Sequence, residues 1–108
     1  MSNILILEAA SQGTPGKTGD PIDMDGSRSV LHIFATSYGT DGKIVIKASS
    51  DGSTFTTLED PATTSGLAEY SADTIFNLDK IPQGWTLRAD LEITTGTATG
   101  LKVYLGTN

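Results

Sequence analysis

GKIVIKASSDGSTFTTL, residues 42–58, contains two runs of β-forming residues on either side of Asp51-Gly52. Asp and Gly both tolerate positive φ, which the two central residues of a type I′ turn require, and this turn has the twist of a β-hairpin. The stretch therefore predicts a tight hairpin with a two-residue loop. We expect the rest of the chain to form strands that cover this hairpin.

The register of the hairpin follows from the polarity of its two faces. A two-residue loop pairs Ala48 with Phe55 and Ile46 with Thr57. The apolar face then carries Ile44, Ile46, Ala48 and Phe55, and the opposite face carries Lys43 and Lys47. Because a shift by one residue moves side chains to the other face, the pattern predicts that Phe55 enters the core.

The composition indicates one domain built from short strands. The chain has 108 residues, of which 37% are hydrophobic and 19% are charged, with 12 glycines and 4 prolines. This length supports one modest core, and the spread of glycine and proline along the chain indicates frequent turns.

Charge and cysteine content exclude several functions. The net charge is −6 and the 7 basic residues are scattered, whereas binding to a nucleic-acid backbone needs a concentrated positive patch. The lack of cysteine excludes disulfide bonds and thiolate zinc sites. The apolar run at residues 4–7 is too short for a signal peptide or a membrane span, so we expect neither general secretory export nor membrane insertion.

Strands are predicted on both sides of the hairpin. Before it lie a short apolar run at residues 3–9 and a strand at residues 27–38 that is apolar on both faces and therefore central. After it come strands at residues 73–78, 85–94 and 101–105. Residues 85–94 alternate between apolar and polar side chains, as a half-buried antiparallel strand does.

These short strands predict an all-β fold. We expect an antiparallel β-sandwich of the jelly-roll or immunoglobulin-like type with seven to eight strands, and a small closed barrel is the alternative. Residues 1–108 would form a single domain. Within it, residues 1–27 would form an N-terminal strand and an extended arm, and residues 28–108 would form the sandwich core.

The N-terminal segment contains the candidate contact residues. Its first strand is apolar on both faces, and the glycine- and proline-rich residues 11–25 are typical of an extended arm. Such a strand can add to the sheet edge of another chain. The candidates for an interface with another chain are Ile4, Leu5, Ile6, Leu7, Pro15 and Lys17.

SQGTPGKT, residues 11–18, has some features of a nucleotide-binding loop, but two others oppose that interpretation. Ser11 stands where a P-loop requires glycine. Gly-Asp-Pro at residues 19–21 prevents the helix whose N-terminus would hold the phosphates. The segment therefore predicts a loop that does not bind nucleotide.

Acidic residues at positions 20, 23 and 25 resemble part of a calcium loop. The EF-hand pattern requires an acidic residue where Pro21 stands and a glutamate where His32 stands. A solvated acidic loop is the favoured interpretation, and a weak cation site of another type is the alternative. No metal and no other cofactor is predicted.

The sequence contains no evident catalytic constellation. His32 is the single histidine, and we expect it on a strand face or at a subunit interface, because a triad or zinc site needs further partners. Asp90 and Glu92 share one strand face about 7 Å apart, within the ~6.5–9.5 Å range of inverting glycosidases. Arg88 and Lys102 lie nearby, so a salt-bridged outer face is favoured and no enzymatic activity is predicted.

A carbohydrate-binding interpretation rests on aromatic residues. Trp85, Tyr38 and Tyr70 could form a platform for sugar rings. Trp85 has the parity of the inward-facing residues of its strand, so a position in the core or at its rim is favoured.

Two stretches together resemble small virion proteins of tailed bacteriophages: VLHIFATSYGTDGKIVIKASSDGSTFTTL, residues 30–58, and IPQGWTLRADLEITTGTATGLKVYLG, residues 81–106. The first has a strand, a Gly-containing turn, and a strand ending in Ser-x-Asp-Gly, followed by Thr and an aromatic residue. The second has Pro-x-Gly, a strand that contains an Arg, a Gly/Thr-rich turn and a last apolar strand. Together they cover about half of the chain.

The resemblance implies a capsid decoration (cement) protein, or a related head or tail accessory protein, on a β-sandwich. Such proteins are commonly oligomers, often trimers at the three-fold positions of a capsid. We therefore expect a non-enzymatic structural protein, made in the host cytoplasm and located on the virion surface, that binds the major capsid protein and stabilises the head. The alternatives are a carbohydrate-binding or adhesin-like β-sandwich module and a tail accessory protein.

Overall fold

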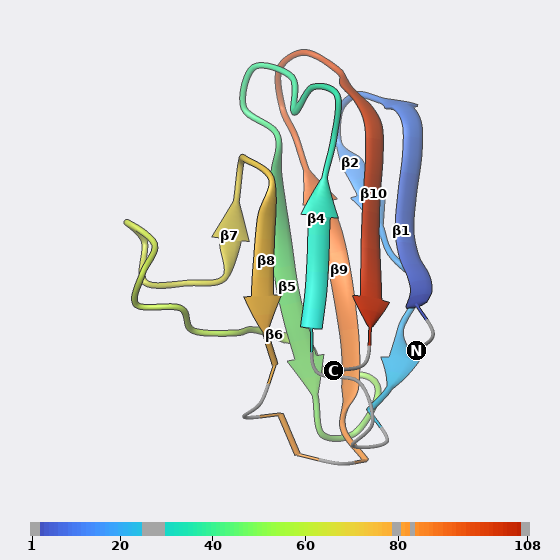
Figure 1. Ribbon diagram of the computed structural model, residues 1–108, viewed down its shortest axis with the longest axis vertical. Coiled ribbons are helices and arrows are strands. Elements are labelled where there is room, and N and C mark those ends of the chain that lie inside the picture. The colour runs from blue at the N-terminus through green and yellow to red at the C-terminus, as the bar shows by residue number, and fades with distance from the viewer. Residues whose placement is uncertain (1–2, 25–29, 79–80, 83, 107–108) are drawn as a thin grey trace.

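The computed structural model describes residues 3–24, 30–78, 81–82 and 84–106. Its strands form two antiparallel sheets, and the described residues contain no helix. Figure 1 shows the two layers, with β8, β4, β10 and β1 in front of β5 and β9. The predicted all-β antiparallel sandwich is confirmed.

Sheet A contains β1 (Asn3–Gln12), β10 (Ala98–Gly106), β4 (Val30–Phe34) and β8 (Thr74–Asn77), in that order. Sheet B has β9 (Thr86–Glu92) and β5 (Lys43–Ser49) at its centre. Two short strands, β2 (Gly16–Thr18) and β3 (Ile22–Asp23), pair with the free side of β9. Two others, β6 (Thr56–Thr57) and β7 (Glu69–Tyr70), pair with the free side of β5.

This strand order is that of a jelly roll. β2 and β3 share one position in sheet B, and β6 and β7 share another, so each sheet has four strand positions. Apart from the step from β5 to β6, the chain crosses to the other sheet at every change of position. The neighbours are β1 and β10, β2/β3 and β9, β4 and β8, and β5 and β6/β7, as in two wound Greek keys. The structure thus favours the jelly roll over the immunoglobulin-like alternative.

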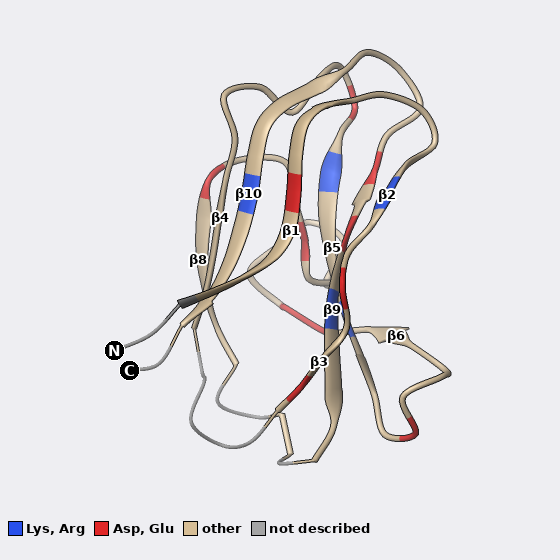
Figure 2. Ribbon diagram, turned by 90° about the vertical axis from the view of Figure 1, so that its right-hand side faces the viewer, with Lys and Arg blue, Asp and Glu red and all other residues tan. Residues whose placement is uncertain are grey.

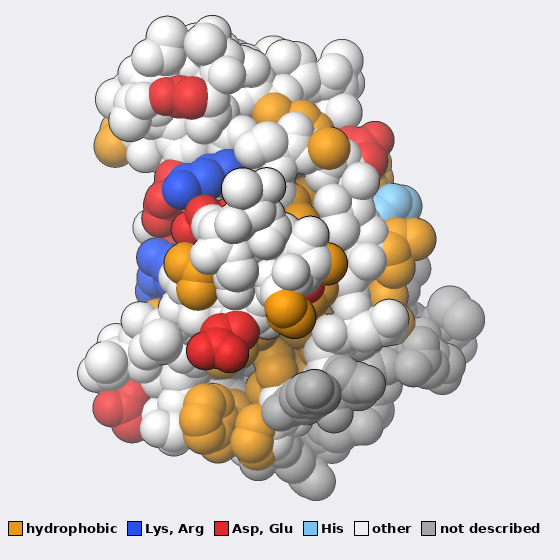
Figure 3. Space-filling view, turned by 90° about the vertical axis from the view of Figure 1, so that its left-hand side faces the viewer, with side chains coloured by type: hydrophobic (Ala, Val, Ile, Leu, Met, Phe, Trp, Pro, Cys, Tyr) orange, Lys and Arg blue, Asp and Glu red, His pale blue; other side chains and the backbone are white. Residues whose placement is uncertain are grey.

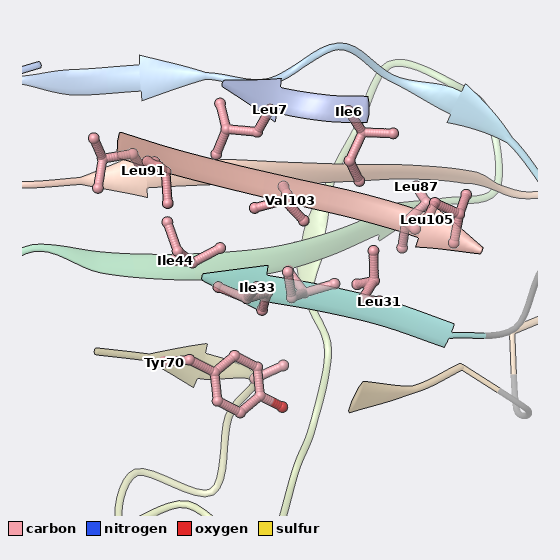
Figure 4. Close-up of a cluster of buried hydrophobic side chains, with 14 of the residues drawn as sticks. Ile6, Leu7, Leu31, Ile33, Ile44, Tyr70, Leu87, Leu91, Val103 and Leu105 are labelled. Atoms are coloured by element: carbon pink, nitrogen blue, oxygen red, sulfur yellow. The ribbon is translucent and has the colours of Figure 1, made fainter. Parts of the chain in front are cut away.

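The inward-facing residues of the two sheets form one core. In β9 the predicted inward positions of Leu87, Ala89 and Leu91 are confirmed, and the polar side of the strand is partly covered, since Thr86 and Asp90 are also buried. The labelled side chains in Figure 4 come from both sheets and lie in the space between them. The largest fully buried members include Leu31, Ile33, Ile44, Ile46, Leu101 and Leu105. This packing makes both outer faces rigid surfaces.

β1 is part of the sandwich. It pairs with β10 along its whole length, and a bulge between Leu5 and Leu7 turns both Ile6 and Leu7 into the core. On its other side, the Asp20 N–H donates a hydrogen bond to the Ile6 carbonyl at 3.0 Å. β1 lies where the N-terminal strand was predicted, and the segment after it, which we expected to extend as an arm, supplies β2 and β3 of the domain.

The hairpin forms in a register one residue away from the predicted one. Ala48 pairs with Thr56 instead of Phe55. Phe55 consequently lies on the outer face of sheet B, where the Arg88 guanidinium is 4.2 Å from the centre of its ring. The prediction that Phe55 enters the core was wrong.

The hairpin loop is longer than two residues because Asp51 caps it. The Asp51 carboxylate accepts hydrogen bonds from the N–H groups of Ser53 and Thr54 and from the Ser49 hydroxyl, each at 2.8 Å. Gly52 has a φ of 78°, but among the described residues only glycines have positive φ. Asp51 therefore does not adopt the type I′ conformation, and it stabilises the loop through its side chain.

Asp51 is expected to make the hairpin acid-sensitive. The N–H of Thr54, then that of Ser53 and the Ser49 hydroxyl, lower its pKa from 3.8 to about 2. Because the folded-state pKa is lowered, the stabilisation is present above pH 3.8 and is lost as the pH falls through about 2. Asp51→Asn should unfold at a lower temperature than the wild-type chain near neutral pH, and this difference should vanish near pH 2. A difference in unfolding temperature that is independent of pH would contradict the assignment.

Candidate functional site

A row of side chains crosses the outer face of sheet A. Leu5 pairs with Tyr104, Tyr104 with His32, and His32 with Ile75, so four strands each contribute one residue to the row. Ile75 is 68% exposed and Leu5 is 37% exposed. These residues point outward because their chain neighbours, such as Leu31, Ile33 and Leu105, are in the core.

Two further side chains of β4 extend this row into a patch. Val30 and Phe34 share the parity of His32 and are half-buried. The His32 and Phe34 rings lie 4.7 Å apart, and the Phe34 and Tyr104 rings are stacked with centroids 6.0 Å apart. We call these six residues the outer patch: Leu5, Val30, His32, Phe34, Ile75 and Tyr104. None of the six is charged, and the Lys102–Glu8 ion pair borders them on the same face, where Lys102 is the cross-strand partner of Phe34.

The outer patch has the chemistry of a protein-docking surface. Large apolar side chains on a solvent-facing sheet expose hydrocarbon to water, and covering them releases free energy. The position of His32 on a strand face agrees with the prediction for it. Ile75, Phe34 and Tyr104 were not among the interface candidates predicted from the sequence, although the apolar residues on both faces of residues 30–34 were the available signal.

The predicted interface residues separate into buried and exposed groups. Ile6 and Leu7 are buried in the core of their own chain, and Ile4 is half-buried and packs against that core. Leu5 joins the outer patch. Pro15, between β1 and β2, and Lys17, in β2, are both exposed, and the Lys17 ammonium donates a hydrogen bond to the Glu8 carbonyl of β1. A small groove of about 210 Å³ brings Leu5–Leu7 and Lys17 together at the β1–β2 edge.

The outer face of sheet B carries ion pairs. Arg88 makes two 2.9 Å hydrogen bonds to the carboxylate of Asp90, and the Lys47 ammonium lies 3.3 Å from it. Glu92 has looser contacts, 3.9 Å from Lys43 and 3.7 Å from Lys47. Figure 2 shows acidic and basic segments together on β5 and β9.

These contacts confirm the predicted salt-bridged face and leave the carboxylates paired with cations. A glycosidase needs one carboxyl group that can donate a proton and one that can act as a base, with room for a water between them. One detail was wrong: Lys102 lies on sheet A and pairs with Glu8 at 4.0 Å instead of with Asp90 or Glu92.

The N-terminal motifs take part in the sheets. Residues 11–18 contain the last two residues of β1 and the whole of β2, and β2 pairs with β9. The segment is therefore not followed by the helix whose N-terminus would bind phosphate. Asp23 accepts a hydrogen bond from the Thr86 hydroxyl at 3.0 Å. Asp25, the third acidic residue of the possible cation site, lies outside the described residues. Within the described part of the chain, no group of three acidic or histidine side chains could hold a metal ion, and no helix could cross a membrane.

The aromatic candidates for sugar binding have different positions. Tyr70 is buried and donates a hydrogen bond to Asp60 at 2.6 Å, and Tyr38 donates one to Asp73 at 2.8 Å. Burial, followed by the hydrogen bond and the negative charge of the carboxylate, raises the pKa of both tyrosines above its ordinary range. Both hydroxyls are therefore structural donors. Trp85 lies at the rim and is 37% exposed.

Comparison of the chain with protein-family models, curated proteins and solved structures gave no match. Its function therefore has to be argued from the surfaces described above.

Proposed function

We propose that this protein is a non-enzymatic structural component of a phage particle, a capsid decoration protein that binds the major capsid protein and stabilises the head. The observation that carries the proposal is the outer patch of sheet A, an apolar and aromatic surface that the Lys102–Glu8 ion pair borders on one side. The two stretches that resemble phage virion proteins support the phage assignment, and they form β4, β5, β6, β9 and β10.

The chemistry of the outer patch supports a protein partner. The centres of protein interfaces are enriched in aromatic residues and depleted of charge, as this patch is. The net charge of −6 favours a partner whose surface around the contact is basic. We include in the proposal that the protein is an oligomer, with a trimer at capsid three-fold positions as the expected form.

Purified particles provide the direct test of the phage assignment. Mass spectrometry of virions should find this protein in many copies relative to the major capsid protein. Its absence from the particle would contradict the proposal. Mass measurement of the isolated protein in solution should find a trimer, and a strictly monomeric protein would contradict the proposed oligomeric state.

Ile75→Asp should weaken binding to undecorated particles by about tenfold or more. It places a charge on the most exposed side chain of the outer patch, at the β8 end of the row. Because Ile75 is largely exposed, the change should leave the fold intact, as circular dichroism would verify. Ala62→Asp is the matched control, since it adds the same charge to an exposed residue outside the outer patch. Equal decoration by both variants would exclude the outer patch as the docking surface.

A further inference from the structure

A groove of about 620 Å³ lies beside the end of β5. Its walls are formed by residues 48–51 at the end of β5, residues 54 and 56–59 around β6, and Trp85. It is separate from the outer patch, because its lining residues belong to sheet B and its loops. Nothing in the proposed capsid contact uses this groove.

Backbone hydrogen bonds position Trp85 at the groove. Its carbonyl accepts a hydrogen bond from the Met24 N–H at 2.7 Å, and its N–H donates one to the Pro82 carbonyl at 3.2 Å. The adjacent Gly84 N–H donates to the Met24 carbonyl at 2.7 Å. A large aromatic residue that is 37% exposed thus lines the groove from a position set by its backbone. Its ring can bind a flat apolar face.

The other lining side chains are hydroxyl-bearing or acidic. Ser50, Thr54, Thr56 and Thr57 supply hydroxyl groups, and Asp51 and Glu59 supply carboxylates, whereas the Ser49 hydroxyl is buried and bonded to Asp51. Asp51 stays ionised at physiological pH because its pKa is held at about 2. The lining contains no Lys or Arg, so an anionic ligand would meet only negative charge. The groove therefore suits a ligand rich in hydroxyl donors and without negative charge.

A second hollow adjoins this groove and indicates a ligand longer than one ring. It has a volume of about 420 Å³ and shares Leu58 and Glu59 with the groove. It adds apolar surface from Pro61, Phe76 and Ile81. Figure 3 faces this edge of the sandwich, where hydrophobic and acidic side chains lie close together and the visible basic side chains lie toward the left.

We propose that this groove binds a neutral oligosaccharide, with one sugar ring stacked on Trp85 and its hydroxyls bonded to the Ser, Thr and carboxylate side chains. An aromatic ring fits the apolar face of a sugar, and carboxylates and hydroxyls accept its O–H groups. The site goes beyond the proposed capsid contact, and either proposal can fail without the other.

Trp85 is the one tryptophan of the chain, so its fluorescence reports directly on the groove. The full-length protein should be titrated with cello-, malto-, xylo- and chito-oligosaccharides up to about 10 mM, and with heparin as an anionic glycan. At least one neutral oligosaccharide should shift the emission and protect Trp85 from quenching by acrylamide. Lack of any response to all four neutral series would overturn the proposal, as would tighter binding of heparin.

Two variants separate ring stacking from loss of fold. Trp85→Ala should lower the affinity for the oligosaccharide that binds best, measured by calorimetry, by about tenfold or more. Ile75→Ala, which removes exposed hydrocarbon from the outer patch instead, should bind it unchanged. The protection of wild-type Trp85 from acrylamide remains decisive should the Trp85→Ala chain not fold. Unchanged affinity of a folded Trp85→Ala chain would overturn the assignment of the ring.

Discussion

Deleting residues 3–12, which form β1, should leave a chain that does not fold. β1 is paired with β10 from end to end and contributes Ile6, Leu7 and Ala9 to the core. Burial of one Ile or Leu side chain contributes about 1.5–3 kcal/mol, while a domain of this size has a net stability of about 5–15 kcal/mol. The deletion also makes β10 an unprotected edge strand. Circular dichroism and urea unfolding should find no cooperative transition.

Two single substitutions on β1 test the same point in a folded protein. Leu7→Ala creates a cavity in the core and should lower the free energy of unfolding by about 2–4 kcal/mol. Leu5→Ala removes a side chain that is largely outside the core, and it should cost less than about 1 kcal/mol. Cooperative unfolding of the truncated chain with the wild-type midpoint, or equal effects of the two substitutions, would show that β1 is a dispensable arm.

The fold class and the best-patterned strand were predictable from the sequence because they depend on local alternation. Residues 85–94 alternate strictly, so burial of Leu87, Ala89 and Leu91 followed from the period of a strand alone. The pairing of β1 with β10 depends on contacts between chain ends and has no local signal.

The hairpin register and the location of β1 were missed for separate physical reasons. The Asp51 side chain replaces the two-residue turn by a longer capped loop, and the Arg88–Phe55 contact compensates for an aromatic ring outside the core. In β1, the bulge after Leu5 places two successive residues inward. Because the apolar run at residues 3–9 does not alternate, its pattern did not indicate which of its side chains face the core.

The outer patch was missed because it is formed across four strands. Leu5, Tyr104, His32 and Ile75 are far apart in the sequence and meet only through the strand order of sheet A. The groove beside Trp85 also combines segments that are far apart in the sequence. Its hydroxyl-bearing side chains come from the β5–β6 hairpin, and the Trp85 ring comes from the segment before β9. Sequence reasoning identified Trp85 but not the side chains that surround it.

Asp90→Ala should be the most destabilising charge substitution on sheet B. The Asp90 side chain is only 7% exposed, and its carboxylate pairs with Arg88 and Lys47 and accepts the buried Gly19 N–H at 3.2 Å. Its removal leaves two partly buried cations and one buried donor without this partner. Breaking a buried pair costs about 3–5 kcal/mol, and the remaining solvent access of the cations reduces this to about 2–3 kcal/mol.

Glu92→Ala is the matched control for Asp90→Ala, because both carboxylates lie on the same face of β9. The Glu92 side chain is 48% exposed and its nearest cation is 3.7 Å away. Its removal should change the free energy of unfolding by less than about 0.5 kcal/mol, and added salt should screen even that contribution. Asp90→Asn should fall between the two, since the amide oxygen still accepts the Gly19 N–H but no longer neutralises the cations.

Urea unfolding of the three variants decides whether Asp90 acts through burial or through charge alone. Burial predicts that Asp90→Ala remains destabilising in high salt, because a pair removed from solvent is little screened. If Asp90→Ala and Glu92→Ala lowered the free energy of unfolding equally, and both effects disappeared in high salt, the outer face of sheet B would be an ordinary solvated ion-pair surface. With the expected result, the Asp90 cluster stabilises the sandwich by connecting the segment after β2 to β9 and β5 through Gly19, Arg88 and Lys47.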